Sequence, residues 1–221
     1  VNFTAMSEKL DPEAVHEIMD GCFEILGREI HGAGGTINQY TGDGVMALFG
    51  APVAYDDHIR LACQAALNIQ THLGKYHKKI QDRHDLSFKM RIGIHSGPVV
   101  VGAIGDDLRL DYTAQGDTTN VAARLQSLAG PGEILVSERI HLGAGNHFVF
   151  EDRGAAALKG KEQPVRIFAL LRESADESLD LKTEAASLPY IGRDKEIGML
   201  TRSFEDALSD GPTLIAVTGE G

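Results

Sequence analysis

Residues 41–50 read TGDGVMALFG and place a single carboxylate, Asp43, between two glycines. Short runs with apolar residues flank this segment, at 36–40 before it and at 45–49 after it. Two such runs around a glycine-bounded pair of residues are typical of a β-hairpin, because the tight turn needs a backbone conformation that glycine adopts readily. The stretch therefore predicts two antiparallel strands with Asp43 at their turn. Gly-Asp-Gly is common in hairpin turns, so it does not by itself indicate a catalytic site.

A second informative stretch, residues 111–125, reads DYTAQGDTTNVAARL. From Asp117 to Ala129 the spacing of apolar residues is helical, and Gly-Pro-Gly at 130–132 ends the helix. Asn120 and Arg124 are four residues apart, so a helix brings them to one face. Without further context, such a pair indicates only a solvated helix surface.

Periodicity and capping signals divide much of the chain into alternating helices and strands. Asp11-Pro12 is a typical helix start, because an aspartate caps the first turn and proline fits its first position. We expect helices at 12–31, 56–84, 117–129 and 137–142, and strands at 36–40, 45–49, 88–94, 99–104, 133–136, 148–151 and 165–170. This alternation predicts an α+β fold on the ferredoxin-like βαββαβ plan, with a central antiparallel sheet and helices over one face.

The composition is that of a globular protein, with 43% hydrophobic and 24% charged residues among 221. A formal net charge of -11 without a basic cluster argues against a nucleic-acid partner. No apolar run is long enough for a membrane span, and the first residues lack the basic region and apolar stretch from which we would expect a signal peptide. The two cysteines, Cys22 and Cys63, fall on apolar helix faces, so we expect reduced core residues and a cytoplasmic protein.

Together the two stretches resemble the catalytic segments of class III adenylyl and guanylyl cyclases, over residues 1–171. The neighbours of the Asn/Arg pair keep the family's order, and Lys159 lies in a Leu-Lys-Gly-Lys loop of the same pattern. The resemblance implies a homodimeric enzyme that holds ATP on two Mg²⁺ or Mn²⁺ ions and closes the 3′-hydroxyl onto the α-phosphate. It implies that Asp43 binds metal, Asn120 orients the ribose, Arg124 meets the α-phosphate and Lys159 reaches the terminal phosphates.

The sequence departs from the family pattern in two places. The family's first metal-binding aspartate lies on a strand before the segment that begins at Val1, and Asn2 stands where glycine is common. From this difference we expect little or no turnover from the chain as printed. The positions that contact the base hold Gln39 and Thr113, which match neither the usual adenine set nor the usual guanine set. A glutamine amide both donates and accepts, so it can satisfy either purine, and we expect ATP.

The amino-acid composition changes over the last fifty residues. Residues 172–189 are rich in acidic and small residues and read as a linker. Residues 190–221 resemble the start of an AAA-like or STAND-type P-loop ATPase domain, an α/β fold, and they stop at Gly-Glu-Gly before the rest of a phosphate loop. We expect this attached domain to follow the cyclase domain.

Three alternatives remain open at this point. The chain could be a catalytically silent cyclase fold that dimerises or senses nucleotides for the attached ATPase, or it could be a guanylyl cyclase. Joint retention of a metal-binding aspartate, the Asn/Arg pair and the lysine weighs against a silent fold. A diguanylate cyclase is disfavoured, because its Gly-Gly-Asp/Glu-Glu-Phe turn is not found at the hairpin of residues 41–44.

Overall fold

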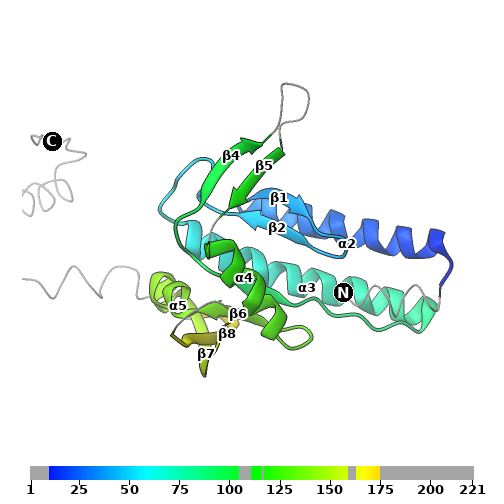
Figure 1. Ribbon diagram of the computed structural model, residues 1–221. Coiled ribbons are helices and arrows are strands. Elements are labelled where there is room, and N and C mark those ends of the chain that lie inside the picture. Colours follow the sequence, from blue (N-terminus) through cyan, green and yellow to red (C-terminus); the bar gives the residue numbers. More distant parts are fainter. Residues whose placement is uncertain (1–9, 105–110, 116, 159–162, 175–221) are drawn as a thin grey trace, which may run out of the picture. The chain divides into compact units, whose positions relative to one another are not determined.

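A computed structural model of the protein describes residues 10–104, 111–115, 117–158 and 163–174 (Figure 1). The chain divides into two compact units, Val1–Asp176 and Glu177–Gly221. The second unit lies outside the described residues, and so do the predicted P-loop segment and Lys159. None of the described helices is both long enough and apolar enough to cross a membrane.

Helices and strands alternate along the first unit (Figure 1). The helices are α2 (Pro12–Gly32), α3 (His58–His84), α4 (Asp117–Leu128) and α5 (Glu138–Ala144), which runs into a 3₁₀ turn, η1 (Gly145–His147). The strands are β1 (Thr36–Tyr40), β2 (Val45–Leu48), β3 (Ile92–Ile94), β4 (Val100–Ile104), β5 (Asp111–Gln115), β6 (Ile134–Ser137), β7 (Phe148–Ala156) and β8 (Val165–Glu173). The expected helices and the hairpin are confirmed with small differences at their ends. The strand predicted for 88–94 is confined to β3, and β5 was not predicted.

The main sheet has four strands in the order β3-β6-β8-β7, while β1-β2 and β4-β5 form separate antiparallel pairs. Within the main sheet β3 and β6 are parallel, and the other pairs are antiparallel. The prediction of an antiparallel central sheet is therefore wrong for β3 and β6. A parallel pair needs a long crossover, and the chain between these strands supplies one that contains β4, β5 and α4.

Helices cover both faces of this sheet, which corrects the expectation of helices over one face. Residues of α4 pack with Leu135, Ile167 and Ala169 on one face. On the opposite face, residues of α3 and α5 pack against the strand residues that alternate with these, such as Val136 and Phe168. All four residues of β6 are buried, as expected for a strand covered on both sides.

A second core lies between α2 and α3, which run side by side (Figure 1). Asp11 caps α2 by accepting a hydrogen bond of 2.8 Å from the backbone N–H of Ala14. The buried face of α2 repeats at helical spacing through Val15, Ile18, Met19, Cys22, Leu26 and Ile30. The β1–β2 hairpin packs against this core through its half-buried apolar residues, so α2 supports the hairpin.

Candidate functional site

The turn of the hairpin presents Asp43 to solvent. The backbone groups of Thr41 and Gly44 exchange two hydrogen bonds, of 2.8 and 3.2 Å, and so close a two-residue loop. Gly42 has a φ of 60°, which an L side chain rarely adopts, and a positive φ at this first position is the pattern of a type II′ turn. The Asp43 side chain is exposed, and no described residue forms a hydrogen bond or ion pair with it. A free carboxylate at a rigid turn is suited to bind a hard cation.

The strand before this turn carries the predicted base contact. Gln39 is exposed and pairs across the hairpin with Met46. The register shifts between Ile37 and Gln39, so Asn38 forms a bulge. Both polar side-chain atoms of Asn38 are buried and have no hydrogen-bond partner among the described residues. Such a bulge re-aims the neighbouring side chains, and sequence patterns gave no sign of it.

The other half of the predicted site lies on α4. Thr118, Val121 and Leu125 face the protein and are buried. A Cβ atom on Gly93 of β3 would lie 2.2 Å from the Ala122 carbonyl oxygen, so the strand and the helix meet backbone to backbone. This contact is possible only because residue 93 has no side chain. It fixes the rotation of α4 and leaves Asn120 exposed on its first turn.

Arg124 follows Asn120 by one turn and is half-buried. Its Nη1 atom is buried and has no hydrogen-bond partner among the described residues. A buried guanidinium N–H without an acceptor loses its hydration and gains nothing in return. Phosphate oxygens match guanidinium geometry well, so this arrangement is suited to an anionic ligand.

The structure groups the predicted residues into two sets. Gln39 and Asp43 share the β1–β2 hairpin, whereas Asn120 and Arg124 share α4. Strand β5 contacts both β1 and α4, and Thr113 lies in its centre, paired with Gly102. Lys159 lies outside the described residues, so its predicted role stays a prediction.

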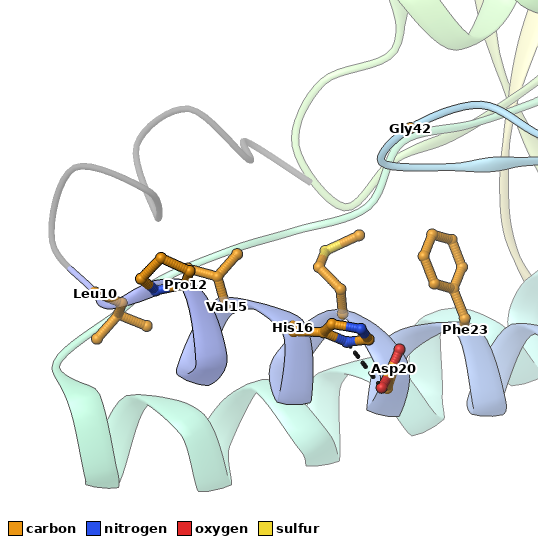
Figure 2. A pocket seen from close by; sticks show the side chains of 8 residues that line it. Leu10, Pro12, Val15, His16, Asp20, Phe23 and Gly42 are labelled. Carbon is orange, nitrogen blue, oxygen red and sulfur yellow. Dashed lines mark ion pairs between the residues drawn. The ribbon is translucent and has the colours of Figure 1, made fainter.

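A cavity of about 500 Å³ lies between the first half of α2 and the hairpin turn (Figure 2). Its walls are mainly apolar side chains of α2, and Gly42 lies on the opposite side (Figure 2). His16 and Asp20 also border it, with His16 Nδ1 at 2.9 Å from the Asp20 carboxylate. Asp43, Asn120 and Arg124 are not among its lining residues. Apolar walls suit hydrophobic side chains better than a triphosphate, so we do not assign the nucleotide to this cavity.

Among residues that the structure describes, no other titratable groups form a second reactive centre. Burial raises the pKa of Cys22 to about 11 and that of Cys63 to about 12, so both stay neutral thiols, and both are free and buried as expected. A hydrogen bond from Arg60 lowers the pKa of Asp57, the residue before α3. The described residues contain no group of three or more His, Cys, Asp or Glu side chains placed to hold a metal ion. A metal at Asp43 would therefore need ligands from the substrate or from another segment.

Comparisons with known proteins identify the family of the chain. The profile of the family described as "Adenylate and Guanylate cyclase catalytic domain" matches residues 1–172. Adenylate cyclase 1 of Rhizobium meliloti is 33% identical over 172 residues, which cover 77% of this chain and 26% of that protein. The chain thus spans about a quarter of the length of this relative.

Two solved structures have similar folds. The adenylyl cyclase CyaB from P. aeruginosa aligns with a TM-score of 0.75 and 29% identity, covering 79% of this chain and 90% of that one. The guanylyl cyclase Cya2 aligns with a TM-score of 0.74 and 31% identity, covering 81% of this chain and 91% of that one. One of these structures is an adenylyl cyclase and the other a guanylyl cyclase, so similarity alone does not decide between ATP and GTP as the substrate.

Proposed function

Because the chain belongs to the adenylate and guanylate cyclase catalytic-domain family, we propose that it converts ATP to 3′,5′-cyclic AMP and pyrophosphate. The observation that carries the proposal is the half-buried Arg124, whose Nη1 has no acceptor among the described residues and lies one helical turn from the exposed Asn120. A guanidinium with a free N–H group of this kind can donate a hydrogen bond to a phosphate oxygen. The ribose is then within the reach of the same helix face.

In the proposed reaction the 3′-oxygen attacks the α-phosphorus in line with the bond to the β-phosphate. A new P–O3′ bond forms, the α–β bridging P–O bond breaks, and the 3′-hydroxyl proton passes to solvent. Asn120 holds the ribose so that its 3′-oxygen is aligned, and Arg124 stabilises the charge that develops on the α-phosphate oxygens. Lys159 binds the terminal phosphates. These contacts strengthen in the transition state, so they act on turnover more than on affinity.

Asp43 supports a proposal of Mg²⁺ or Mn²⁺ as the cofactor, with two ions per site. A carboxylate oxygen free of other partners is the donor that these hard cations prefer, together with substrate phosphates. A bound divalent ion neutralises phosphate charge and activates the attacking hydroxyl. Equilibrium dialysis with Mn²⁺ and ATP should show metal retention that Asp43→Asn weakens. Equal retention by both proteins would remove Asp43 from the metal site.

The base preference rests on Gln39 and Thr113. Gln39 is exposed on β1, and Thr113 lies on β5, the strand that contacts β1, so the two predicted base contacts lie on neighbouring strands. We expect turnover of ATP to exceed that of GTP. Assays with both nucleotides test this, and a faster reaction with GTP would make the protein a guanylyl cyclase.

A homodimer is the proposed active form, in which Asp43 of one subunit works with Asn120 and Arg124 of its partner. The proposal is supported by the separation of the predicted residues into two sets, because Asp43 lies on the β1–β2 hairpin and the Asn/Arg pair lies on α4. Mixing the Asp43→Asn and Arg124→Ala variants tests the arrangement. Each variant alone is expected to keep on the order of one hundredth of the turnover, whereas a mixed dimer retains one intact site and regains much of the activity.

The direct test is incubation of the full-length protein with ATP and Mn²⁺, followed by chromatography of the products. Cyclic AMP and pyrophosphate in equal amounts are expected. Arg124→Ala and Asn120→Ala should lower kcat on the order of hundredfold and change KM little. Normal nucleotide binding and dimerisation without any cyclic product would instead identify a silent module.

Assay of residues 1–221 alongside the full-length protein tests the expected low turnover of this segment. The attached ATPase domain and the cytoplasmic location stay predictions.

A further inference from the structure

The loop between β3 and β4 is fastened to the protein by three side chains from different elements. Ser137 at the end of β6 is hydrogen-bonded to His95, with 2.7 Å between Oγ and Nδ1. Arg139 of α5 donates to the Ser96 carbonyl oxygen at 3.4 Å. Thr118 of α4 donates to the carbonyl oxygen of Pro98 at 2.7 Å. The loop is thus a fixed support rather than a free connection.

Thr118 makes the closest of these contacts to the predicted site. Its side chain is 9% exposed, and a Cβ atom on Gly97 would lie 2.6 Å from its Oγ1. The hydroxyl is therefore enclosed between residue 97 and the carbonyl group that it binds. Because a buried hydroxyl without its acceptor is costly, the hydrogen bond holds the start of α4 in one position.

The support acts at one end of the helix. Thr118 is the second residue of α4 and lies two residues before Asn120. With about 100° of rotation per residue, the two side chains point in nearly opposite directions. Thr118 thus holds the buried side of the first turn, and Asn120 stands on its exposed side. Gly93 supports the helix further along, at Ala122 and Gln126, close to Arg124.

We infer that Thr118 is a positioning residue of the cyclase reaction, which it serves by fixing the first turn of α4 and so the direction of Asn120. This inference rests on the proposed function. Thr118 itself touches no reacting atom in this role. The effect of losing its hydroxyl should pass through Asn120 and should spare Arg124, which the contact at Gly93 holds independently.

The test compares three single variants of the full-length protein. Thr118→Val keeps the shape and removes the hydroxyl, and Thr118→Ser keeps the hydroxyl. Gln70→Met is the matched control, because Gln70 also donates a part-buried hydrogen bond, of 2.9 Å, to a backbone carbonyl twenty residues away, that of Met90. We expect Thr118→Val to lower kcat for ATP about tenfold with little change in KM. Thr118→Ser and Gln70→Met should retain the original kcat.

A double-mutant cycle then asks whether the effect passes through Asn120. In an Asn120→Ala background, Thr118→Val should lower kcat no further, whereas in an Arg124→Ala background it should still do so. The inference is overturned if Thr118→Val keeps full turnover, if Thr118→Ser loses as much, or if the effect persists without Asn120. Should Thr118→Val fail to fold, Gly97→Ala displaces the same hydroxyl and is expected to give the same loss.

The structural part has a readout that does not depend on activity. Amide hydrogen exchange at residues 119–121 should be faster in Thr118→Val than in the unmodified protein and in Gln70→Met. If the unmodified protein makes no cyclic nucleotide, the proposed function fails, and exchange alone decides whether Thr118 holds the turn. Unchanged exchange in Thr118→Val would show that it does not.

Discussion

The hairpin and α4 each carry half of the predicted site, and they hold their residues in different ways. The hairpin presents Asp43 through a local device, a two-residue turn closed by two backbone hydrogen bonds. In contrast, α4 depends on distant parts of the chain, since its buried face packs on the main sheet and its backbone touches Gly93. The site residues of the hairpin can therefore change without cost to the fold. Those of α4 depend on packing that the whole unit supplies.

The largest expected effect is on the packing of α4. Leu125 is fully buried in the core between α4 and the main sheet. Leu125→Ala should lower the free energy of unfolding by about 3 kcal/mol, because it removes packed atoms and leaves a cavity. Urea denaturation measures this. The matched control is Leu128→Ala on the same helix, where the side chain is 51% exposed and little loss is expected. Similar losses in both variants would mean that α4 is not anchored as described.

The next effect sharpens the contrast, since it separates activity from stability. Asp43→Asn should lower turnover on the order of hundredfold, because an amide is a poorer ligand for a divalent cation than a carboxylate. The melting temperature should stay the same, since no described residue bonds to the Asp43 side chain. Cyclase assays and calorimetry of the same preparation check both statements. A clear loss of stability would show that the hairpin is not locally determined.

A smaller effect tests the turn itself. Gly42 has a φ of 60° and open space around it, so Gly42→Ala meets backbone strain without a steric clash. We expect a loss of about 1 kcal/mol in the free energy of unfolding. Gly74→Ala, in α3, also meets no neighbour but has ordinary helical geometry, and it should stabilise the protein slightly. The two alanine variants should thus differ in sign, which thermal unfolding can resolve.

The smallest effect concerns groups that belong to neither half of the site. With a pKa of about 11, Cys22 is a thiolate in about one molecule in a thousand at pH 8. Cys63, with a pKa of about 12, should be less reactive still. Iodoacetamide at pH 8 should therefore leave both thiols unlabelled in the folded protein and label both in urea, without loss of activity in the folded sample. Rapid labelling of the folded protein would contradict their placement in the core.

Sequence patterns predicted the local features and missed those that join distant residues. The apolar spacing and the Asp11 cap predicted α2, and the flanking glycines predicted the turn at Asp43, because each of these signals lies within a few residues. The parallel pairing of β3 with β6 escaped prediction, because about forty residues separate the two strands. Strand β5 was missed for a related reason, since its pairing with β4 defines it more than its composition does.

The same division applies to the candidate site. The four-residue spacing of Asn120 and Arg124 predicts that they share one helix face, and both lie on α4. The bulge at Asn38 and the hydrogen bond from Thr118 to Pro98 are tertiary features, and no pattern of neighbouring residues announces them. The sequence thus predicted which groups form the site, while the structure shows which contacts hold the elements that carry them.

The approach of β3 to α4 at Gly93 has a mechanical consequence. Helices that interlock through long side chains can slide or roll, because rotamers adjust to the new positions. Here no side chain stands between the strand and the Ala122 carbonyl or the Gln126 amide, so no rotamer can absorb such a roll. If α4 tilts, β3 must therefore move with it, and so must β6, which is paired with β3.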